Sequence, residues 1–306
     1  MNPSSAPPSG HERMNVRAHF ALLTLTLALM VVGAWTRAAG AGISCPDWPL
    51  CHGHLVPPLD ATAYPADPRY APFKVYLEFV HRIIAATVTI VVGTLAYGLI
   101  RRRHVKTAVA LLVVLAAQIT MGAVTVLLRN APFTVVIHLG LALTFVAVVI
   151  TSLRIVRPAQ PSGIAAPARW MLLALGVAQL FLGGVVSSRS IGLACYDFPL
   201  CHGSVFPLAW TWPIAWQFAH RAVGFALAGA LLCFAVAVFR RASPRGERRG
   251  AGLLAAGIMA QILLGASNVW FAIPPPVSAA HLGVAAVIFA LLFDEAWRPI
   301  RPRGEP

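Results

Sequence analysis

Two short stretches of the sequence place a histidine and an arginine side by side in apolar surroundings. They are residues 77–82 (LEFVHR) and 216–221 (WQFAHR), and in each the histidine lies about one helical turn inside a long apolar run. Ionisable side chains are costly at such positions, so they indicate a functional site. An imidazole can bind a metal there, and a neighbouring guanidinium can bind a carboxylate.

Two further histidines lie near the start of later apolar runs, so that four histidines form two pairs, His81 with His138 and His220 with His281. Two neutral imidazoles that face each other across a helical bundle are the arrangement of axial haem ligands. The matched positions favour haem ligation over the alternative, in which each histidine is hydrogen-bonded and packs at a helix interface. Zinc and copper sites normally bring further ligands close by, and the runs show no such cluster.

The arginines that follow the first histidine of each pair, Arg82 and Arg221, are candidate anion ligands. A guanidinium fork matches the geometry of a carboxylate, so we predict that both contact haem propionates. Arg82 can also form a helical ion pair with Glu78, four residues earlier. The two roles are compatible.

Glu78 distinguishes the first stretch from the second. It lies three residues before His81, hence on the same helix face, and its counterpart Gln217 is nearly isosteric but cannot exchange a proton. We therefore predict that the first stretch belongs to a catalytic site with Glu78 as acid or base. The second then belongs to a cofactor or electron-transfer site. A purely structural salt bridge with Arg82 is the alternative for Glu78.

Long apolar segments must position these residues. Of the 306 residues, 58% are hydrophobic and 11% are charged, which excludes a soluble globular domain and indicates a polytopic membrane protein. The runs are continuous rather than alternating, which excludes a β-barrel. We expect an all-α protein with eight transmembrane helices of about 20 residues each. The expected helices cover 18–36, 76–99, 107–127, 133–153, 169–187, 214–239, 250–271 and 278–296.

The distribution of basic residues predicts the orientation in the membrane. The net charge of +14 could suggest nucleic-acid binding, but the arginines and lysines concentrate near the termini and in alternate loops. The positive-inside rule therefore places both termini in the cytoplasm, with membrane lipid and no nucleic acid as partner. We expect residues 1–17 to form a disordered tail and 298–306 a second tail. The short N-terminal segment lacks an arginine-rich presequence, which favours a bacterial plasma membrane over a mitochondrial one.

An internal repeat divides the chain. The motif CPDWPLCHG at 45–53 matches CYDFPLCHG at 195–203 with an offset of 150 residues. We expect two tandem four-helix bundles in the same orientation, 18–157 and 169–297, joined by a linker at 158–168. The first bundle has the longer outer loop, which could cover a site.

Three glutamines share one spacing, four residues before a glycine: Gln118, Gln179 and Gln261. Small residues and polar side chains at this spacing are typical of contacts between membrane helices. We assign these glutamines to helix packing and interhelical hydrogen bonds.

Four of the five cysteines fall in two loops that the topology places outside: Cys45, Cys51, Cys195 and Cys201. Outer compartments are oxidising, so a disulfide-closed turn over each histidine pair is expected. A catalytic or redox-sensing dithiol is one alternative. Metal binding by the first cysteine pair with His52 and His54 is another alternative. It is the weaker one, because the second loop has Ser204 in place of the second histidine.

The two cysteine motifs, the ExxHR stretch and the four histidines together resemble the haem A synthase family, over residues 17–297. The resemblance implies oxidation of the C8 methyl group of haem O to the formyl group of haem A, the prosthetic group of aa3-type terminal oxidases. It also implies that His81 and His138 flank the substrate haem, while His220 and His281 bind a resident haem b.

The same resemblance implies that Glu78 is the catalytic carboxylate and that the Cys45 and Cys51 pair is functionally important. Expected partners are a haem O synthase, a redox partner and the terminal oxidase during assembly, and a homo-oligomer remains open. Three other functions fit part of the pattern. They are a quinone-linked two-haem electron carrier, a membrane thiol oxidoreductase acting through the outer cysteines, and a haem-handling module without catalysis.

Overall fold

The computed structural model describes residues 10–241 and 243–300, with side chains from residue 16 onward. Within this part of the chain the regular structure is helical, apart from isolated β-bridges. Two short 3-10 helices, η1 (Ala61–Ala63) and η2 (Pro68–Tyr70), lie in the loop after α1. The long helices are α1 (Gly10–Ala38), α2 (Pro72–Arg101), α3 (Val105–Leu127), α4 (Pro132–Val156), α5 (Ala166–Ser188), α6 (Trp212–Phe239), α7 (Arg245–Trp270) and α8 (Pro275–Ala296).

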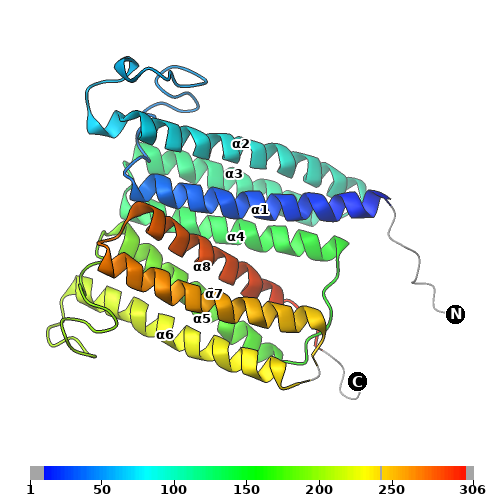
Figure 1. Ribbon diagram of the computed structural model, residues 1–306. Coiled ribbons are helices and arrows are strands. Elements are labelled where there is room, and N and C mark those ends of the chain that lie inside the picture. The colour runs from blue at the N-terminus through cyan, green and yellow to red at the C-terminus, as the bar shows by residue number, and fades with distance from the viewer. Residues whose placement is uncertain (1–9, 242, 301–306) are drawn as a thin grey trace.

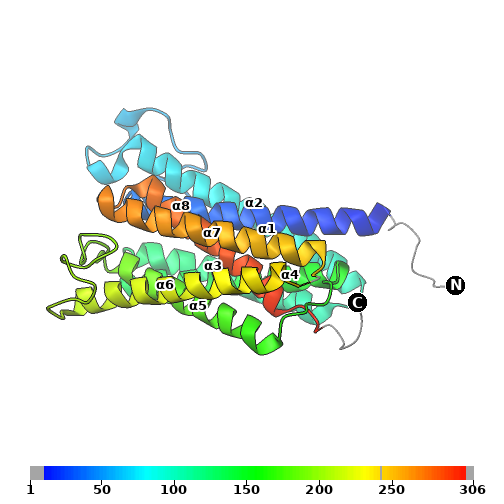
Figure 2. The ribbon, with the colours of Figure 1, turned by 60° about the horizontal axis from the view of Figure 1, so that its bottom comes forward.

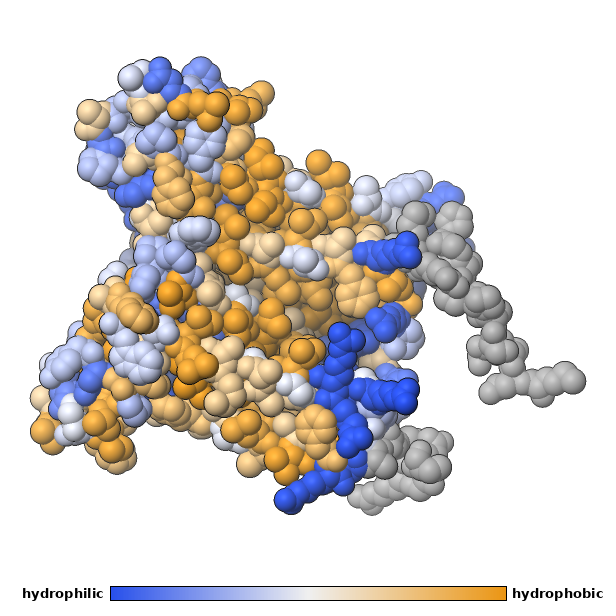
Figure 3. All heavy atoms as spheres, in the orientation of Figure 1, coloured by the Kyte–Doolittle hydropathy of each residue, from blue (hydrophilic) through white to orange (hydrophobic). Residues whose placement is uncertain are grey.

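All eight helices are long and apolar enough to cross a membrane, the crossing part of α1 being Val16–Ala38. The predicted all-α membrane fold is therefore confirmed. Five of them, α2, α4, α5, α6 and α8, carry proline in the first turn, where the missing amide hydrogen costs nothing and the fixed φ suits a helix. Apolar side chains cover the middle of the molecule, and polar ones lie toward its two ends (Figure 3).

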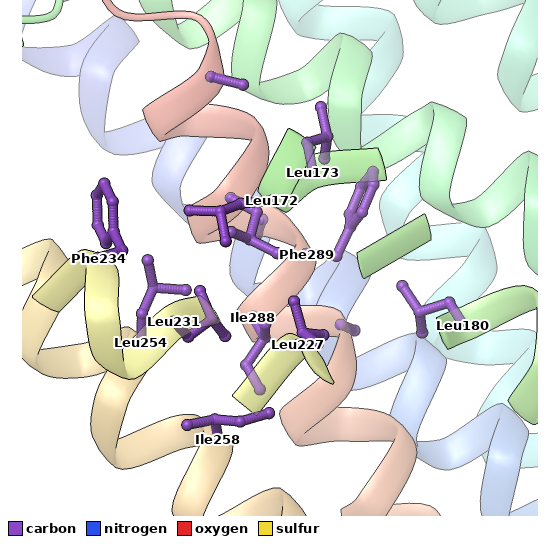
Figure 4. Packing of buried hydrophobic residues seen from close by; sticks show 14 of the residues in the cluster. Leu172, Leu173, Leu180, Leu227, Leu231, Phe234, Leu254, Ile258, Ile288 and Phe289 are labelled. Atoms are coloured by element: carbon purple, nitrogen blue, oxygen red, sulfur yellow. The ribbon is translucent and has the colours of Figure 1, made fainter. Parts of the chain in front are cut away.

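The helices pack as two groups that meet along α1, α4, α5 and α8. Helix α1 contacts α2, α4 and α8, and α5 contacts α4, α6 and α8, so α2, α3, α6 and α7 lie farther out (Figure 1). A large cluster of buried side chains includes Leu231, Leu254 and Ile288, from α6, α7 and α8 (Figure 4). Because lipid tails are as apolar as leucine, close packing rather than hydrophobic burial stabilises such contacts in a membrane.

The two ends of the bundle differ. Both cysteine-containing loops lie at one end, and α1 begins and α8 ends at the other (Figures 1 and 2). We call these the cysteine-loop end and the opposite end.

The segment predicted as a linker, 158–168, is packed against the second group of helices. Ser162 is fully buried; its amide donates to the Pro299 carbonyl at 2.8 Å and its hydroxyl to Glu247 of α7 at 2.5 Å. Helix α1 begins at Gly10, so part of the predicted N-terminal tail is helical. Residues 1–9 and 301–306, the rest of that tail and most of the C-terminal one, lie outside the described residues.

Candidate functional site

The four histidines lie near the N-terminal ends of α2, α4, α6 and α8, all at the cysteine-loop end. The ring centroids of His220 and His281 are 6.5 Å apart, with an angle of 68° between the planes. His81 and His138 are also close enough to interact electrostatically. The structure thus brings the histidines together in the pairs that the sequence predicts.

Each histidine ring lies against a glycine of the helix that precedes its own in the chain. The pairs are His81 with Gly33, His138 with Gly122, His220 with Gly183 and His281 with Gly265. The sequence pattern predicted Gly122, Gly183 and Gly265 only as small residues at helix contacts, and it gave no indication of Gly33.

The three glutamines assigned to packing contact the histidines. The side-chain nitrogens of Gln118, Gln179 and Gln261 lie 3.4, 3.4 and 3.2 Å from Nε2 of the adjacent histidine. His81 has no such neighbour, because Leu29 occupies the corresponding position four residues before Gly33. The surroundings of His81 therefore differ from those of His220 in two ways: Leu29 replaces the glutamine, and Glu78 replaces Gln217.

Glu78 is almost fully buried between α2 and the first cysteine loop. One carboxylate oxygen accepts a hydrogen bond from the Cys45 amide at 2.8 Å, and the other accepts from Arg82 Nη2 at 2.7 Å. Arg82 also donates to the carbonyl oxygens of Cys45, Asp47 and Leu50, at 3.0, 2.7 and 2.6 Å. The ion pair predicted as an alternative is therefore present, and it fixes the loop on the helix.

The second group of helices builds the same frame without a carboxylate. The Gln217 carbonyl accepts from the Cys195 amide at 2.7 Å, while its amide nitrogen donates to the Gly192 carbonyl. Arg221 donates to loop carbonyls, as Arg82 does. The recorded partners of both guanidinium groups belong to the protein, so contact with propionates stays a prediction.

Both cysteine pairs form disulfides, with S–S distances of 2.04 Å for Cys45–Cys51 and 2.00 Å for Cys195–Cys201. The predicted disulfide-closed turns are confirmed. The sulfurs are thus bonded to each other, and the described residues contain no cluster of three or more His, Cys, Asp or Glu side chains. The alternative of a metal site in the first loop is not supported.

An aspartate shapes each turn. The Asp47 carboxylate accepts from the amides of His52 and Gly53, both at 2.7 Å, and these two residues have positive φ, 52° and 77°. Burial alone would raise the pKa of Asp47. The hydrogen bonds from the Gly53 and His52 amides together lower the pKa by more than burial raises it, so the net pKa lies below its ordinary value. Asp197 plays the same part in the second loop.

The additional residues of the first loop cover its disulfide. Tyr64 is buried against Cys45 and Cys51, and Tyr70 packs beside them. The Tyr76 hydroxyl of α2 donates to the Pro57 carbonyl of the loop at 2.6 Å. At the second disulfide the apolar cluster consists of Ile214, which is the counterpart of Val75 in α2, and Ala194. The longer loop therefore adds cover to the disulfide whose Cys45 amide donates to Glu78.

Arg37, which sequence reasoning missed, joins the two groups of helices at the cysteine-loop end. Its two terminal nitrogens donate to the side chain and the carbonyl of Ser187, both at 2.8 Å. The signal available in the sequence was a single arginine in the last turn of an apolar segment.

Eight membrane-spanning helices that carry two histidine pairs beneath two disulfide-closed loops define a multi-pass membrane protein with paired candidate metal ligands. Residues 17–293 match the model of the cytochrome oxidase assembly protein family, COX15-CtaA. Because the match spans most of the chain, the protein belongs to this family.

Curated relatives match over similar lengths. The Heme A synthase of Shewanella oneidensis is 28% identical, over 88% of this chain and 92% of that protein. The Heme A synthase of Bradyrhizobium sp. is 26% identical over 97% and 95%. The Heme A synthase of Symbiobacterium thermophilum is 31% identical over 79% and 82%.

Proposed function

We propose that the protein is a haem A synthase, which oxidises the C8 methyl group of haem O to a formyl group and so supplies haem A to aa3-type terminal oxidases. Family membership and the names of the relatives support haem A biosynthesis. The observation that carries a catalytic role is the contrast between Glu78 and Gln217, a carboxylate and an amide in otherwise matching frames.

The histidine pairs fit axial ligation of haem. All four Nδ1 atoms are buried and make no hydrogen bond within the described residues, and each donor set consists of two imidazoles rather than the three or four ligands of a zinc site. His81 and His138 would flank the substrate haem. His220 and His281 would hold a resident haem b, which would supply one-electron transfer when bound.

Glu78 is held where it can exchange protons with a substrate beside His81. Converting a methyl group to an aldehyde, through an alcohol and a hydrated aldehyde, removes protons and electrons in successive steps. A carboxylate one helical turn from His81 can accept or relay those protons. The Cys45 amide and Arg82 fix its position, while Gln217 cannot perform this exchange.

Burial of the cysteines argues against the thiol oxidoreductase alternative. Cys45 and Cys195 are fully buried, and Cys51 and Cys201 are 2% exposed, so a protein thiol has no direct access to the sulfurs. A two-haem electron carrier uses the histidines equally well, but it gives Glu78 no task.

The surroundings of the protein complete the proposal. We place it in a bacterial plasma membrane with the cysteine loops outside. Its partners would be a haem O synthase, a redox partner and the oxidase under assembly. Arg82 and Arg221 are the proposed propionate contacts beside the two histidine pairs.

Haem analysis of cells tests this function. The protein is expressed in a host that makes haem O but no haem A, and extracted haems are separated by chromatography beside an empty-vector control. Haem A should appear only with the protein. If the cells contain protohaem and unchanged haem O, the protein is not a synthase and the electron-carrier alternative stands.

A further inference from the structure

We propose that four glycines, Gly33, Gly122, Gly183 and Gly265, position the four histidines by letting each imidazole lie directly against a helix backbone. This inference rests on the proposed haem ligation and extends it to residues that bind no metal themselves. We call each glycine and the space beside it a notch.

The contacts are tighter than a side chain's Cβ atom normally makes. A Cβ atom added at Gly33 or Gly183 would lie 2.9 or 3.0 Å from Cε1 of His81 or His220. At Gly122 and Gly265 the distance to the histidine Cε1 would be 3.3 Å. Every one of these contacts is with an imidazole, which packing constrains far more than the end of a flexible side chain.

Other glycines of the bundle have no imidazole neighbour: some, such as Gly176 and Gly283, meet the ends of aliphatic side chains, and others meet nothing. A Cβ at Gly93, Gly98, Gly140 or Gly229 would meet nothing within 4 Å. Glycine is the least favourable residue in a helix interior apart from proline. Its presence at all four imidazole contacts, on four different helices, is therefore explained by the rings that lie there.

A notch also exposes a backbone carbonyl to the ring. The backbone of Leu29 lies beside His81, that of Gln179 beside His220 and that of Gln261 beside His281. In all three cases the residue lies four positions, about one turn, before the glycine. None of the Nδ1 atoms yet makes a hydrogen bond within the described residues. Donation from Nδ1–H to that carbonyl would fix the tautomer and leave the Nε2 lone pair available to a metal.

An alanine in a notch should displace the imidazole without removing it. Gly183→Ala places a methyl group 3.0 Å from His220 Cε1, so the ring must tilt and its second nitrogen loses alignment. Mutating a residue that orients a metal-binding histidine typically lowers the affinity for the metal by about tenfold or more. We expect weaker haem retention, an altered low-spin electron paramagnetic resonance signal and a shifted midpoint potential.

The test compares purified Gly183→Ala with Gly229→Ala, which makes the same change on α6 where the space is open. Haem per protein, the low-spin signal and the potential are measured, together with thermal unfolding of haem-free samples to separate ligation from folding. Gly183→Ala should lose about tenfold in haem retention with a changed signal, and Gly229→Ala should match the wild type. Gly265→Ala, with its looser 3.3 Å contact, should show a smaller change and decides the matter if Gly183→Ala does not fold.

Two results would count against the proposal in different ways. If the wild type holds haem and the notch variants match Gly229→Ala in retention, signal and potential, the notch role is wrong and haem ligation stands. If the wild type from haem-replete cells shows no haem spectrum, the ligation on which the notches depend is wrong as well.

Discussion

Glu78 and Arg82 form a desolvated ion pair. The pair fixes the position of the carboxylate more than it stabilises the fold. The Glu78 side chain is 4% exposed and that of Arg82 is 16% exposed, so the mutual attraction is largely offset by lost hydration. The pair nevertheless holds a carboxylate at one helical register and ties three loop carbonyls to α2. A catalytic carboxylate requires this kind of support.

Replacing Arg82 should therefore lower the free energy of unfolding more than replacing Arg221, its counterpart in the second half. Arg82→Leu leaves a buried carboxylate unpaired, and we expect it to lower the free energy of unfolding by about 3 to 5 kcal/mol. Arg221→Leu should cost less, because its neighbour Gln217 is neutral and keeps its bonds to Cys195 and Gly192. Denaturant unfolding in detergent measures both. Equal losses would show that the charge of Glu78 is not buried as described.

The cysteine loops should weaken in acid. The pKa of Asp47 is lowered in the folded loop because the Gly53 and His52 amides outweigh burial. A lowered folded pKa means that the carboxylate stabilises the loop above the ordinary aspartate pKa and loses this effect as the pH falls through the folded value. We compare the rate at which a phosphine reductant opens the Cys45–Cys51 disulfide with its rate on a small unstructured disulfide at the same pH, so that protonation of the phosphine cancels. This relative rate should be higher at pH 3 than at pH 6, as estimated from the ordinary aspartate value of about 3.9.

Asp47→Asn provides the control for this pH effect. An amide cannot accept from both backbone groups through two equivalent oxygens, so the disulfide of the variant should open faster at both pH values, with a smaller difference between them. An unchanged relative rate in the wild type across this range would mean that the Asp47 carboxylate does not hold the turn.

The helices were more predictable than their contacts. Continuous apolar runs predicted α4 at 133–153, and the structure has Pro132–Val156, because bilayer thickness sets helix length. The histidine pairs and disulfides followed from spacing and the repeat. The contacts of Gln118 with His138 and of Ser162 with Glu247 could not be predicted, since they depend on how helices and segments distant in the sequence come together.

The whole molecule is asymmetric along the membrane normal, with disulfide loops at one end and most basic loops at the other. The loop end presents exposed apolar side chains such as Leu208, 86% exposed, and the opposite end contains Lys106 at the start of α3. The positive-inside rule predicts that the basic end faces the cytoplasm.

Cysteine labelling checks this orientation. In a Cys233→Ala background, which removes the one free and exposed thiol of the described residues, Leu208→Cys and Lys106→Cys are each treated with a membrane-impermeant maleimide. In intact spheroplasts the thiol at position 208 should react and that at 106 only after permeabilisation. The reverse pattern would invert the topology and place the candidate site on the cytoplasmic side.

The central claim is that Glu78 makes the site at the first histidine pair, His81 and His138, catalytic. Haem chromatography of Glu78→Gln tests this claim most directly. The variant gives the first frame the residue of the second and keeps an acceptor for the Cys45 amide. Glu247→Gln, which neutralises another buried carboxylate at the opposite end, serves as the control. In a haem O-producing host, the wild type and the control should yield haem A, whereas Glu78→Gln should stall at haem O or its alcohol. Haem A from Glu78→Gln at the wild-type level would contradict the account.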